Sequence, residues 1–174
     1  RCLETTQHRV TEKDFINALG ISTAPYRQVT SADELDAALD ALGRPAVLKT
    51  TRMGYDGKGQ VMIGPDLTAQ DAWDAMGGGE GILEGYVDFE REVSAIVARG
   101  LDGSTACFDA VDNVHQNHIL AETRAPSTIP PALAERAQEI ACKLSDAFDM
   151  AGLLAVEMFV TTTGELLVNE LAAR

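Results

Sequence analysis

A glycine-rich loop between two short apolar runs constrains the fold of this chain more than any other feature. The run 45–49 ends in Lys49, the loop occupies 54–60, and a second apolar run follows at 61–63. This order predicts a strand, a loop and a second strand, because the second run is short and rich in β-forming residues. Backbone N–H groups of glycines approach an anion closely, and Lys58 adds a positive charge. The loop therefore favours a polyphosphate ligand.

Two familiar phosphate-binding motifs do not fit this loop. Walker-type and dinucleotide-binding loops both lead into a helix, whereas 61–63 has the pattern of a strand. Lys58 is followed by Gly59, where a Walker motif requires Ser or Thr. A glycine-rich hairpin that binds no ligand remains the alternative.

Charge narrows the class of partner. The chain has 174 residues, of which 14 are Lys or Arg and 27 are Asp or Glu, for a formal net charge of -13. Such an acidic chain is a poor match for nucleic acid or an anionic membrane surface. Anion binding then depends on a few placed cations, and the candidates are Arg9, Lys13, Lys49, Lys58 and Arg174.

The hydrophobic content indicates the class of domain, and the cysteines bear on the cellular compartment. A hydrophobic fraction of 45% predicts one globular domain or a compact pair of lobes. No apolar run approaches the roughly 18 residues of a membrane span, and no leader is visible, so we expect a cytoplasmic location. Cys2, Cys107 and Cys142 are widely spaced, without zinc or redox spacing, which predicts three reduced thiols.

Helix ends and β-rich runs predict an α+β fold. Capping residues and helical spacing indicate helices from Thr11 to Gly20, Ser31 to Gly43, Thr68 to Gly77 and Pro131 to Met150. Strands are expected at 46–50, 60–64, 81–87, 92–99, 104–111, 116–121, 153–160 and 165–171. Most of these strands are neighbours in sequence, which favours antiparallel pairing over alternating βαβ units.

Two glutamates interrupt the last two apolar strands. Glu157 and Glu170 flank a turn at 161–164, and Asn169 adjoins the second glutamate. A turn centred on 162–163 makes the glutamates diagonal neighbours, and one centred on 163–164 places them directly opposite each other. In either case both carboxylates lie on one face of the sheet, whereas a three-residue loop would break this inference. Unpaired carboxylates on one sheet face repel, and a hard cation such as Mg²⁺ removes the repulsion. The alternative is that one glutamate faces solvent or pairs with an arginine.

A third acidic patch lies in the middle of the chain. Glu84 and Glu92 bracket a kinked stretch at 85–91. Backbone groups in such a segment suit purine recognition, and a carboxylate suits ribose hydroxyls. A solvent-exposed acidic loop is the alternative.

Together these patches resemble the ATP-grasp superfamily, and within it most closely the 5-(carboxyamino)imidazole ribonucleotide synthases. The likeness covers essentially the whole chain. It rests on Lys49, GYDGKGQ at 54–60, EGYV at 84–87, FEREVSAIVARGLDGST at 89–105, NVHQ at 113–116, and LLAVEMFV before LLVNELAAR. The resemblance implies the ATP-grasp fold, with two lobes of mainly antiparallel sheets flanked by helices. It places the smaller lobe at about 14–80 and the larger lobe at about 81–174.

The resemblance implies a nucleotide site made of several parts. Arg9 and Lys49 would contact the ATP phosphates, Glu92 would take the ribose, and His115 would lie beside the nucleotide. The loop closing over the phosphates would comprise Gly54, Tyr55, Asp56, Gly57, Lys58, Gly59 and Gln60. The adenine hinge would comprise Glu84, Gly85, Tyr86 and Val87. From its spacing alone, His115 is a structural residue at the start of a strand.

The resemblance also implies the groups that carry the chemistry. Glu157 and Glu170 would hold Mg²⁺, with Mn²⁺ as an alternative ion, and Asn169 would adjoin the metal and the nucleotide. Lys49 and Arg174 would be catalytic, with Arg174 on the side of the phosphorylated ligand. The implied reaction joins bicarbonate to aminoimidazole ribonucleotide with ATP, through carboxyphosphate, in de novo purine biosynthesis.

The organisation of the parent enzyme follows from the same resemblance. Family members carry an N-terminal nucleotide-fold domain and a C-terminal domain, so the chain would be the central ATP-binding domain of a cytoplasmic homodimer. Ala173 departs from the family, which usually has proline there. Three other functions stay open: an ATP-grasp ligase or carboxylase with a different acceptor, a nucleotide-binding module without chemistry, and a plain α+β interaction domain.

Overall fold

The computed structural model describes residues 2–52, 59–116 and 119–174. The chain folds into two compact units. The smaller unit contains 7–10 and 24–87, and the larger unit contains 1–6, 11–23 and 88–174. The expected boundary near residue 80 lies instead between Val87 and Asp88, because strand β4 (Gly81–Gly85) pairs with strands of the smaller unit. Residues 14–23, expected in the smaller lobe, belong to the larger unit.

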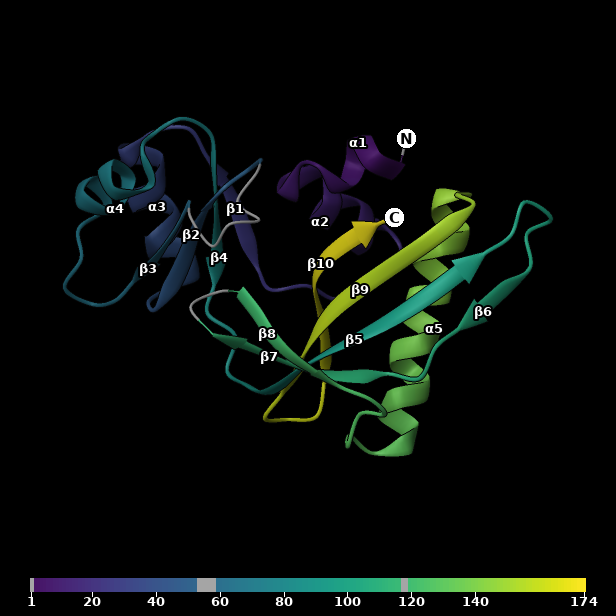
Figure 1. Ribbon diagram of the computed structural model, residues 1–174. Coiled ribbons are helices and arrows are strands. Elements are labelled where there is room, and N and C mark those ends of the chain that lie inside the picture. The colour runs from purple at the N-terminus through teal and green to yellow at the C-terminus, as the bar shows by residue number, and fades with distance from the viewer. Residues whose placement is uncertain (1, 53–58, 117–118) are drawn as a thin grey trace. The chain divides into compact units, whose positions relative to one another are not determined.

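The smaller unit is a four-stranded antiparallel sheet with two helices. The strand order is β1-β4-β2-β3, and the remaining bounds are β1 (Tyr26–Val29), β2 (Ala46–Thr50), β3 (Gln60–Ile63), α3 (Ala32–Leu42) and α4 (Ala69–Met76). Figure 1 shows α3 and α4 side by side in this unit. They cover the sheet through a core in which Leu35, Leu48 and Leu83 are fully buried.

Both helices of the smaller unit begin and end at the residues that the sequence indicates. Ser31 accepts a hydrogen bond from the backbone N–H of Glu34 at 3.2 Å, and Thr68 accepts one from Asp71 at 3.1 Å. Gly43 and Gly77 end the helices with φ of 84° and 95°, a region that glycine adopts without strain. These N-caps satisfy orphan donors of the first turn, so the helix predictions are confirmed.

The larger unit is built on a six-stranded antiparallel sheet. The order is β10-β9-β5-β7-β8, and β6 pairs with β5 beside this path. The bounds are β5 (Phe89–Arg99), β6 (Thr105–Cys107), β7 (Val111–Gln116), β8 (Ile119–Arg124), β9 (Gly152–Thr161) and β10 (Leu166–Ala173). The helices are α1 (Cys2–Thr6), α2 (Arg9–Ala18), which enters this unit at Thr11, and α5 (Pro131–Phe148).

Helix α5 buries one face of this sheet (Figure 1). The period-2 alternation of strands β5 and β9 sends one set of side chains toward the helix. That buried set comprises Val93, Ala95, Val97, Leu154, Val156 and Met158. The other set, which includes Glu92, Ser94 and Glu157, is thereby placed on the opposite face. The apolar pattern thus fixes which face can carry polar chemistry.

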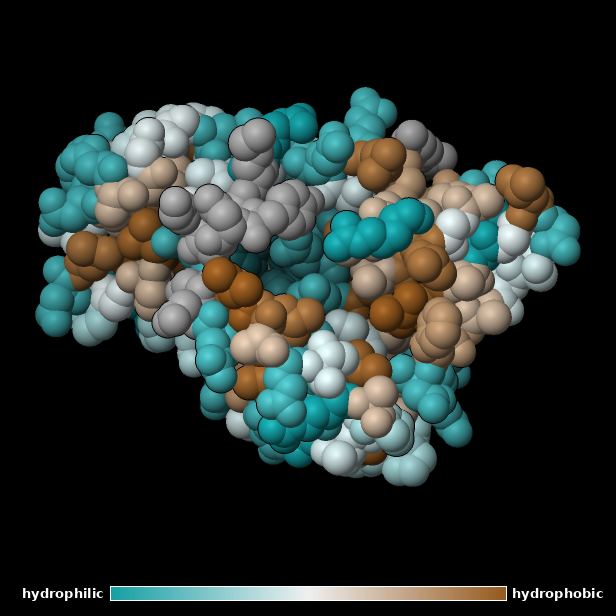
Figure 2. Space-filling model, in the orientation of Figure 1, coloured by the Kyte–Doolittle hydropathy of each residue, from teal (hydrophilic) through white to brown (hydrophobic). Residues whose placement is uncertain are grey.

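Strand β8 forms one edge of this sheet, and all six of its residues are exposed. Figure 2 shows hydrophobic side chains over this strand, and Ile119 and Leu120 are its exposed apolar residues. No other described strand pairs with its outer side. At the opposite edge, by contrast, the backbone of Ser22 accepts a hydrogen bond from Val168 of β10 at 2.9 Å.

Several predicted elements differ from the structure. The single strand expected at 116–121 is wrong, because β7 ends at Gln116 and β8 begins at Ile119 as its antiparallel partner. The strand expected at 104–111 likewise divides into β6 and the start of β7. Helix α1 and strand β1 were not predicted. No helix in the described part of the chain is long and apolar enough to cross a membrane.

Candidate active site

The hairpin of β9 and β10 brings the two glutamates of the sequence motif together. Its loop has three residues, because the backbone N–H of Thr161 bonds to Glu165 O at 2.9 Å and Gly164 closes the turn with φ of 81°. Continued regularly, this loop would place Asn169 opposite Glu157. The ladder instead shifts between Val168 and Glu170, which is a β-bulge at Asn169. Glu170 therefore pairs directly with Glu157, and both lie on one face, as expected.

The environment of Glu157 disfavours the charge of its carboxylate. Burial raises the pKa of Glu157, and the nearby Glu170 carboxylate raises it further. His115 and Arg174 are close enough to oppose this rise in the pKa, whereas Glu92 adds to it. Five ionisable groups predicted from the sequence thus converge within the larger unit. A bound cation would favour the ionised forms of both carboxylates.

Asn169 adds an amide oxygen beside the two carboxylates. Its side-chain Oδ1 is buried and has no hydrogen-bond partner among the described residues. Its backbone carbonyl accepts a hydrogen bond at 3.3 Å from Lys13 Nζ, and Lys13 is only 1% exposed. A buried acceptor without a donor is costly, and a hard cation satisfies it. Lys13 was among the candidate cations of the sequence, but its part in anchoring this bulge carried no sequence signal.

The donor set at this hairpin fits Mg²⁺. It offers two carboxylates and one amide oxygen, which are oxygen ligands of the kind that a hard cation takes. The described residues contain no group of three or more His, Cys, Asp or Glu side chains that could hold an ion on their own. An ion here would complete its shell with water or phosphate oxygens, as Mg²⁺ commonly does.

The same sheet face carries the predicted ribose and nucleotide contacts. His115 Nδ1 lies 2.8 Å from Glu92 Oε2, and both side chains are about one-fifth exposed. His115 stands one residue before the end of β7, not at the start of a strand as expected. Beside this pair, the buried Asn113 donates from Nδ2 to Ser94 Oγ at 2.5 Å. The hydrogen bond between Asn113 and Ser94 was not predicted, because neither residue belongs to a recognisable spacing.

In the smaller unit, the predicted phosphate cations lie near the end of β2. Lys49 Nζ donates to Glu84 Oε2 at 3.0 Å, and the Glu84 side chain is 5% exposed. The Arg9 guanidinium donates through Nη1 to Thr50 O at 2.8 Å. Lys49 lies on β2, and Arg9 of α2 is bonded to Thr50, the next residue of that strand. The Lys49 side chain is 18% exposed and is paired with the buried Glu84.

Only the last two residues of the predicted phosphate loop are described. Gly59 accepts a hydrogen bond from Thr50 N at 2.9 Å, and Gln60 pairs with Lys49. Gly59 has φ of 76°, and an added Cβ would lie 3.1 Å from Thr50 Oγ1, so a side chain there would be strained. Outside the described residues lie Gly54, Tyr55, Asp56, Gly57 and Lys58.

The predicted adenine hinge begins in the last two residues of β4 and runs to Val87, and two of its amides have partners within the unit. Gly85 N donates to Pro25 O at 2.8 Å, and Tyr86 N donates to Pro45 O at 3.3 Å. Neither N–H group is available to a ligand in this structure. Recognition by this segment would use other backbone groups, or Val87 at its end.

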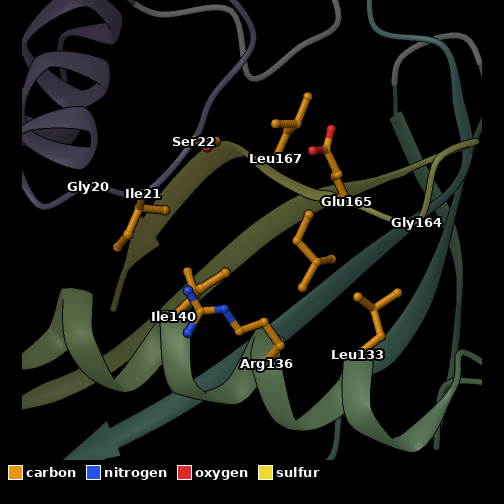
Figure 3. Close-up of a pocket in the computed structure, with 10 residues that line it drawn as sticks. Gly20, Ile21, Ser22, Leu133, Arg136, Ile140, Gly164, Glu165 and Leu167 are labelled. Carbon is orange, nitrogen blue, oxygen red and sulfur yellow. The ribbon is translucent and has the colours of Figure 1, made fainter.

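A pocket on the other side of the larger unit contains none of the predicted site residues. It has a volume of about 320 Å³ and lies among α5, the turn before β10 and the segment that follows α2. Figure 3 shows Ile21, Leu133 and Ile140 around it, with Arg136 and Glu165 at its border. Residues 164–167 of the β9–β10 hairpin line part of this pocket, but Glu157 and Glu170 do not.

Comparison with known proteins identifies close relatives. The sequence profile of the ATP-grasp domain matches residues 14–174. An N5-carboxyaminoimidazole ribonucleotide synthase from Brucella melitensis is 48% identical, over 99% of this chain and 48% of the relative. The synthase of the same name from Bacillus subtilis is 44% identical, over 97% of this chain and 44% of its own length. The chain spans about half the length of these relatives.

Solved structures show the same similarity in three dimensions. The ADP complex of purK, an N5-carboxyaminoimidazole ribonucleotide synthetase, superposes with a TM-score of 0.95 at 43% identity, over 99% of this chain and 46% of that one. The Aspergillus clavatus synthase in complex with ADP and 5-aminoimidazole ribonucleotide gives a TM-score of 0.86 at 26% identity, over 98% and 45%. The expected fold of helices and mainly antiparallel sheets is confirmed. The chain belongs to the ATP-grasp family.

Proposed function

We propose that this chain is the ATP-binding domain of a ligase that carboxylates aminoimidazole ribonucleotide with bicarbonate and ATP, in de novo purine biosynthesis. The observation that carries the proposal is the hairpin at which Glu157 faces Glu170 and Asn169 presents a buried oxygen without a partner. The names and near-complete alignment of the relatives supply the acceptor. The parent protein would be a cytoplasmic homodimer with an N-terminal nucleotide-fold domain and a C-terminal domain.

The proposed chemistry activates bicarbonate, which is a poor electrophile. Transfer of the γ-phosphoryl group of ATP to a bicarbonate oxygen gives carboxyphosphate and ADP. The amine of the acceptor then attacks the carboxyphosphate carbon, or the CO₂ that it releases, and phosphate leaves. The protein contributes positioning and charge neutralisation, which dominate phosphoryl transfer.

Each site residue has a proposed part in that chemistry. Glu157, Asn169 and Glu170 would hold Mg²⁺, which when bound supplies positive charge at the phosphate oxygens. Lys49 and Arg9 would offset the charge that develops on the transferred group. Glu92 and His115 would contact the ribose, and the segment from Glu84 to Val87 would contact the adenine. The 54–60 loop would cover the phosphates, and Arg174 would face the phosphorylated acceptor.

The nucleotide half of the proposal is tested by calorimetric titration of ATP into this chain with and without Mg²⁺. We expect Mg²⁺-dependent binding that Lys49→Ala weakens by about tenfold or more, because a buried charged hydrogen-bonding group is lost. Lys143→Ala on α5 is the matched control, because Lys143 donates to Leu19 O, far from Lys49 in sequence and in another unit. Equal binding by both variants would remove the phosphate role of Lys49.

The acceptor is tested separately in the full-length parent. We expect ADP release that requires both aminoimidazole ribonucleotide and bicarbonate. Turnover with a different amine or carboxylate acceptor would favour another ATP-grasp ligase or carboxylase. Nucleotide binding without turnover on any acceptor would favour a non-catalytic module.

A further inference from the structure

Two of the three cysteines meet in the larger unit, although 34 residues separate them in the sequence. Cys107 lies at the end of β6 and Cys142 lies on α5. Their Sγ atoms are 2.9 Å apart, and both residues are partly exposed. The sequence predicted three separate thiols, because only spacing along the chain was visible there.

The surrounding contacts hold strand β6 and helix α5, which carry the two cysteines, next to each other. Strand β6 pairs with β5 through Val97 and Cys107, and Figure 1 shows it beside α5. The side chain of Gln138, one helical turn before Cys142, donates from Nε2 to Phe108 O at 2.8 Å. The Cys107 thiol also lies 3.7 Å from Gln138 O. The fold itself therefore brings the two thiols together.

We propose that Cys107 and Cys142 form an intramolecular disulfide when the chain meets a low-molecular-weight disulfide, and that this bond ties β6 to α5. A disulfide bond is about 2.05 Å long, so the two sulfur atoms need to approach by less than about 1 Å. Partial exposure gives the oxidant access to the pair. The proposal is independent of the nucleotide-binding function.

The reaction is a thiol–disulfide exchange in two steps. One cysteine thiolate attacks a sulfur of the small disulfide, forms a mixed disulfide and releases one small thiolate, which takes up a proton. The second cysteine then attacks the protein sulfur of that mixed disulfide and releases the second small thiol. The protein loses two protons and two electrons, and the small disulfide is reduced to two thiols.

The reaction rate is expected to depend strongly on pH. Burial raises the pKa of Cys107 to about 12, and the neighbouring Cys142 adds to the rise. The thiolate is the attacking species, so ionisation of Cys107 becomes more frequent as the pH increases. Disulfide formation should be slower at pH 7 than at pH 9.

The third cysteine provides an internal control. Cys2 Sγ lies 3.3 Å from Met150 Sδ, so its described sulfur neighbour is a thioether rather than a thiol. A thioether forms no disulfide, and Cys2 should remain reduced or carry a mixed disulfide. Cys2→Ser therefore leaves the proposed bond intact, whereas Cys107→Ser and Cys142→Ala each remove it.

The test treats the native chain with oxidised glutathione, blocks remaining thiols with N-ethylmaleimide and measures the intact mass. We expect an internal bridge in the wild type and in Cys2→Ser, and a peptide that links Cys107 with Cys142 after proteolysis. The oxidised forms should melt about 5–10 °C higher than the reduced forms, because the bond restricts the unfolded chain. Dithiothreitol should reverse both changes.

Two results would overturn the proposal. One is that the native wild type keeps three blockable thiols at pH 9 while the denatured chain reacts fully. The other is that glutathione adducts or a bridge to Cys2 form instead of the 107–142 link. Using both Cys107→Ser and Cys142→Ala guards against a variant that fails to fold, since either one isolates the partner thiol.

Discussion

Asp112 is a buried carboxylate whose charge is held by neighbouring donors. It lies on β7 and accepts hydrogen bonds from Ser127 Oγ at 2.5 Å and from the backbone N–H of Thr128 at 3.1 Å. Burial by itself would raise the pKa of Asp112, but these hydrogen bonds and Arg91 outweigh it and keep the pKa below the ordinary 3.8. The residue thereby fixes the segment that leads into α5.

This arrangement predicts a pH-dependent contribution to stability. Because the folded pKa is lowered, the ionised Asp112 stabilises the fold above pH 3.8, and the contribution is lost as the pH falls through the lower folded pKa. We expect Asp112→Asn to lower the free energy of unfolding by about 1–2 kcal/mol at pH 7. Urea titrations should show this difference shrinking toward pH 3. An Asp66→Asn control should show little change, and a gap that stays constant with pH would contradict the charge argument.

Glu157 illustrates the opposite case at the residue scale. Burial raises the pKa of Glu157, so its ionisation is disfavoured in the protein without a cation. The pair is therefore retained against a cost in stability, which is typical of sites that bind a charged ligand.

Among the elements, the hairpin of β9 and β10 is the most informative, because its bulge adds a residue without disturbing the pairs beyond it. Asn169 stands as the extra residue, and the pairing resumes with Glu170 opposite Glu157 and Leu171 opposite Val156. Removing Asn169 would leave a regular ladder with the same partners. The bulge thus serves to bring in the amide oxygen.

This geometry predicts that changes at Asn169 weaken ligand binding and leave the fold intact. Deletion of Asn169 and the substitution Asn169→Ala should both leave circular dichroism nearly unchanged. Each should weaken Mg²⁺-dependent ATP binding by about tenfold or more, because one oxygen donor is lost. Nucleotide binding without Mg²⁺ should be unaffected in calorimetry. If binding in the presence of Mg²⁺ were as tight as in the wild type, Asn169 would not be a ligand.

Much of this architecture could be predicted from local signals, and the failures have physical causes. Ser31 and Thr68 mark helix starts through contacts that involve only neighbouring residues, so the sequence suffices. The 116–121 run was misinterpreted because the end of one strand and the start of its antiparallel partner have the same local composition as a single strand.

The sequence correctly predicted that Glu157 and Glu170 lie on one face of the sheet, but the predicted turn differs from the one in the structure. The three-residue loop and the bulge at Asn169 compensate for one another, and neither could be predicted from spacing. Lys13 and the Ser94–Asn113 pair were missed as site neighbours because their partners are distant in sequence. Long-range contacts of this kind leave no periodic trace in the chain.

At the scale of the whole molecule, the chain spans about half the length of the relatives that it matches. The two units each present a set of charged groups with a proposed part in ATP chemistry.

The parent enzyme allows a direct prediction for the metal role. Glu170→Gln keeps the shape of the side chain and removes its charge, so we expect turnover to fall about 100-fold or more while the fold is retained. The comparison is ADP formation by the wild type, Glu170→Gln and a Glu165→Gln control, because Glu165 lies directly after the hairpin loop and away from the pair. Near-normal turnover by Glu170→Gln would remove the metal role.

The exposed edge at β8 affects how this chain behaves in solution. An unpaired strand presents a row of N–H and C=O groups that can template the addition of a strand from another molecule. The two apolar residues at its start, Ile119 and Leu120, favour such pairing, whereas the charged Glu122 and Arg124 near its end oppose it. Self-association through this edge would increase with protein concentration, as it does in the early steps of amyloid-like assembly.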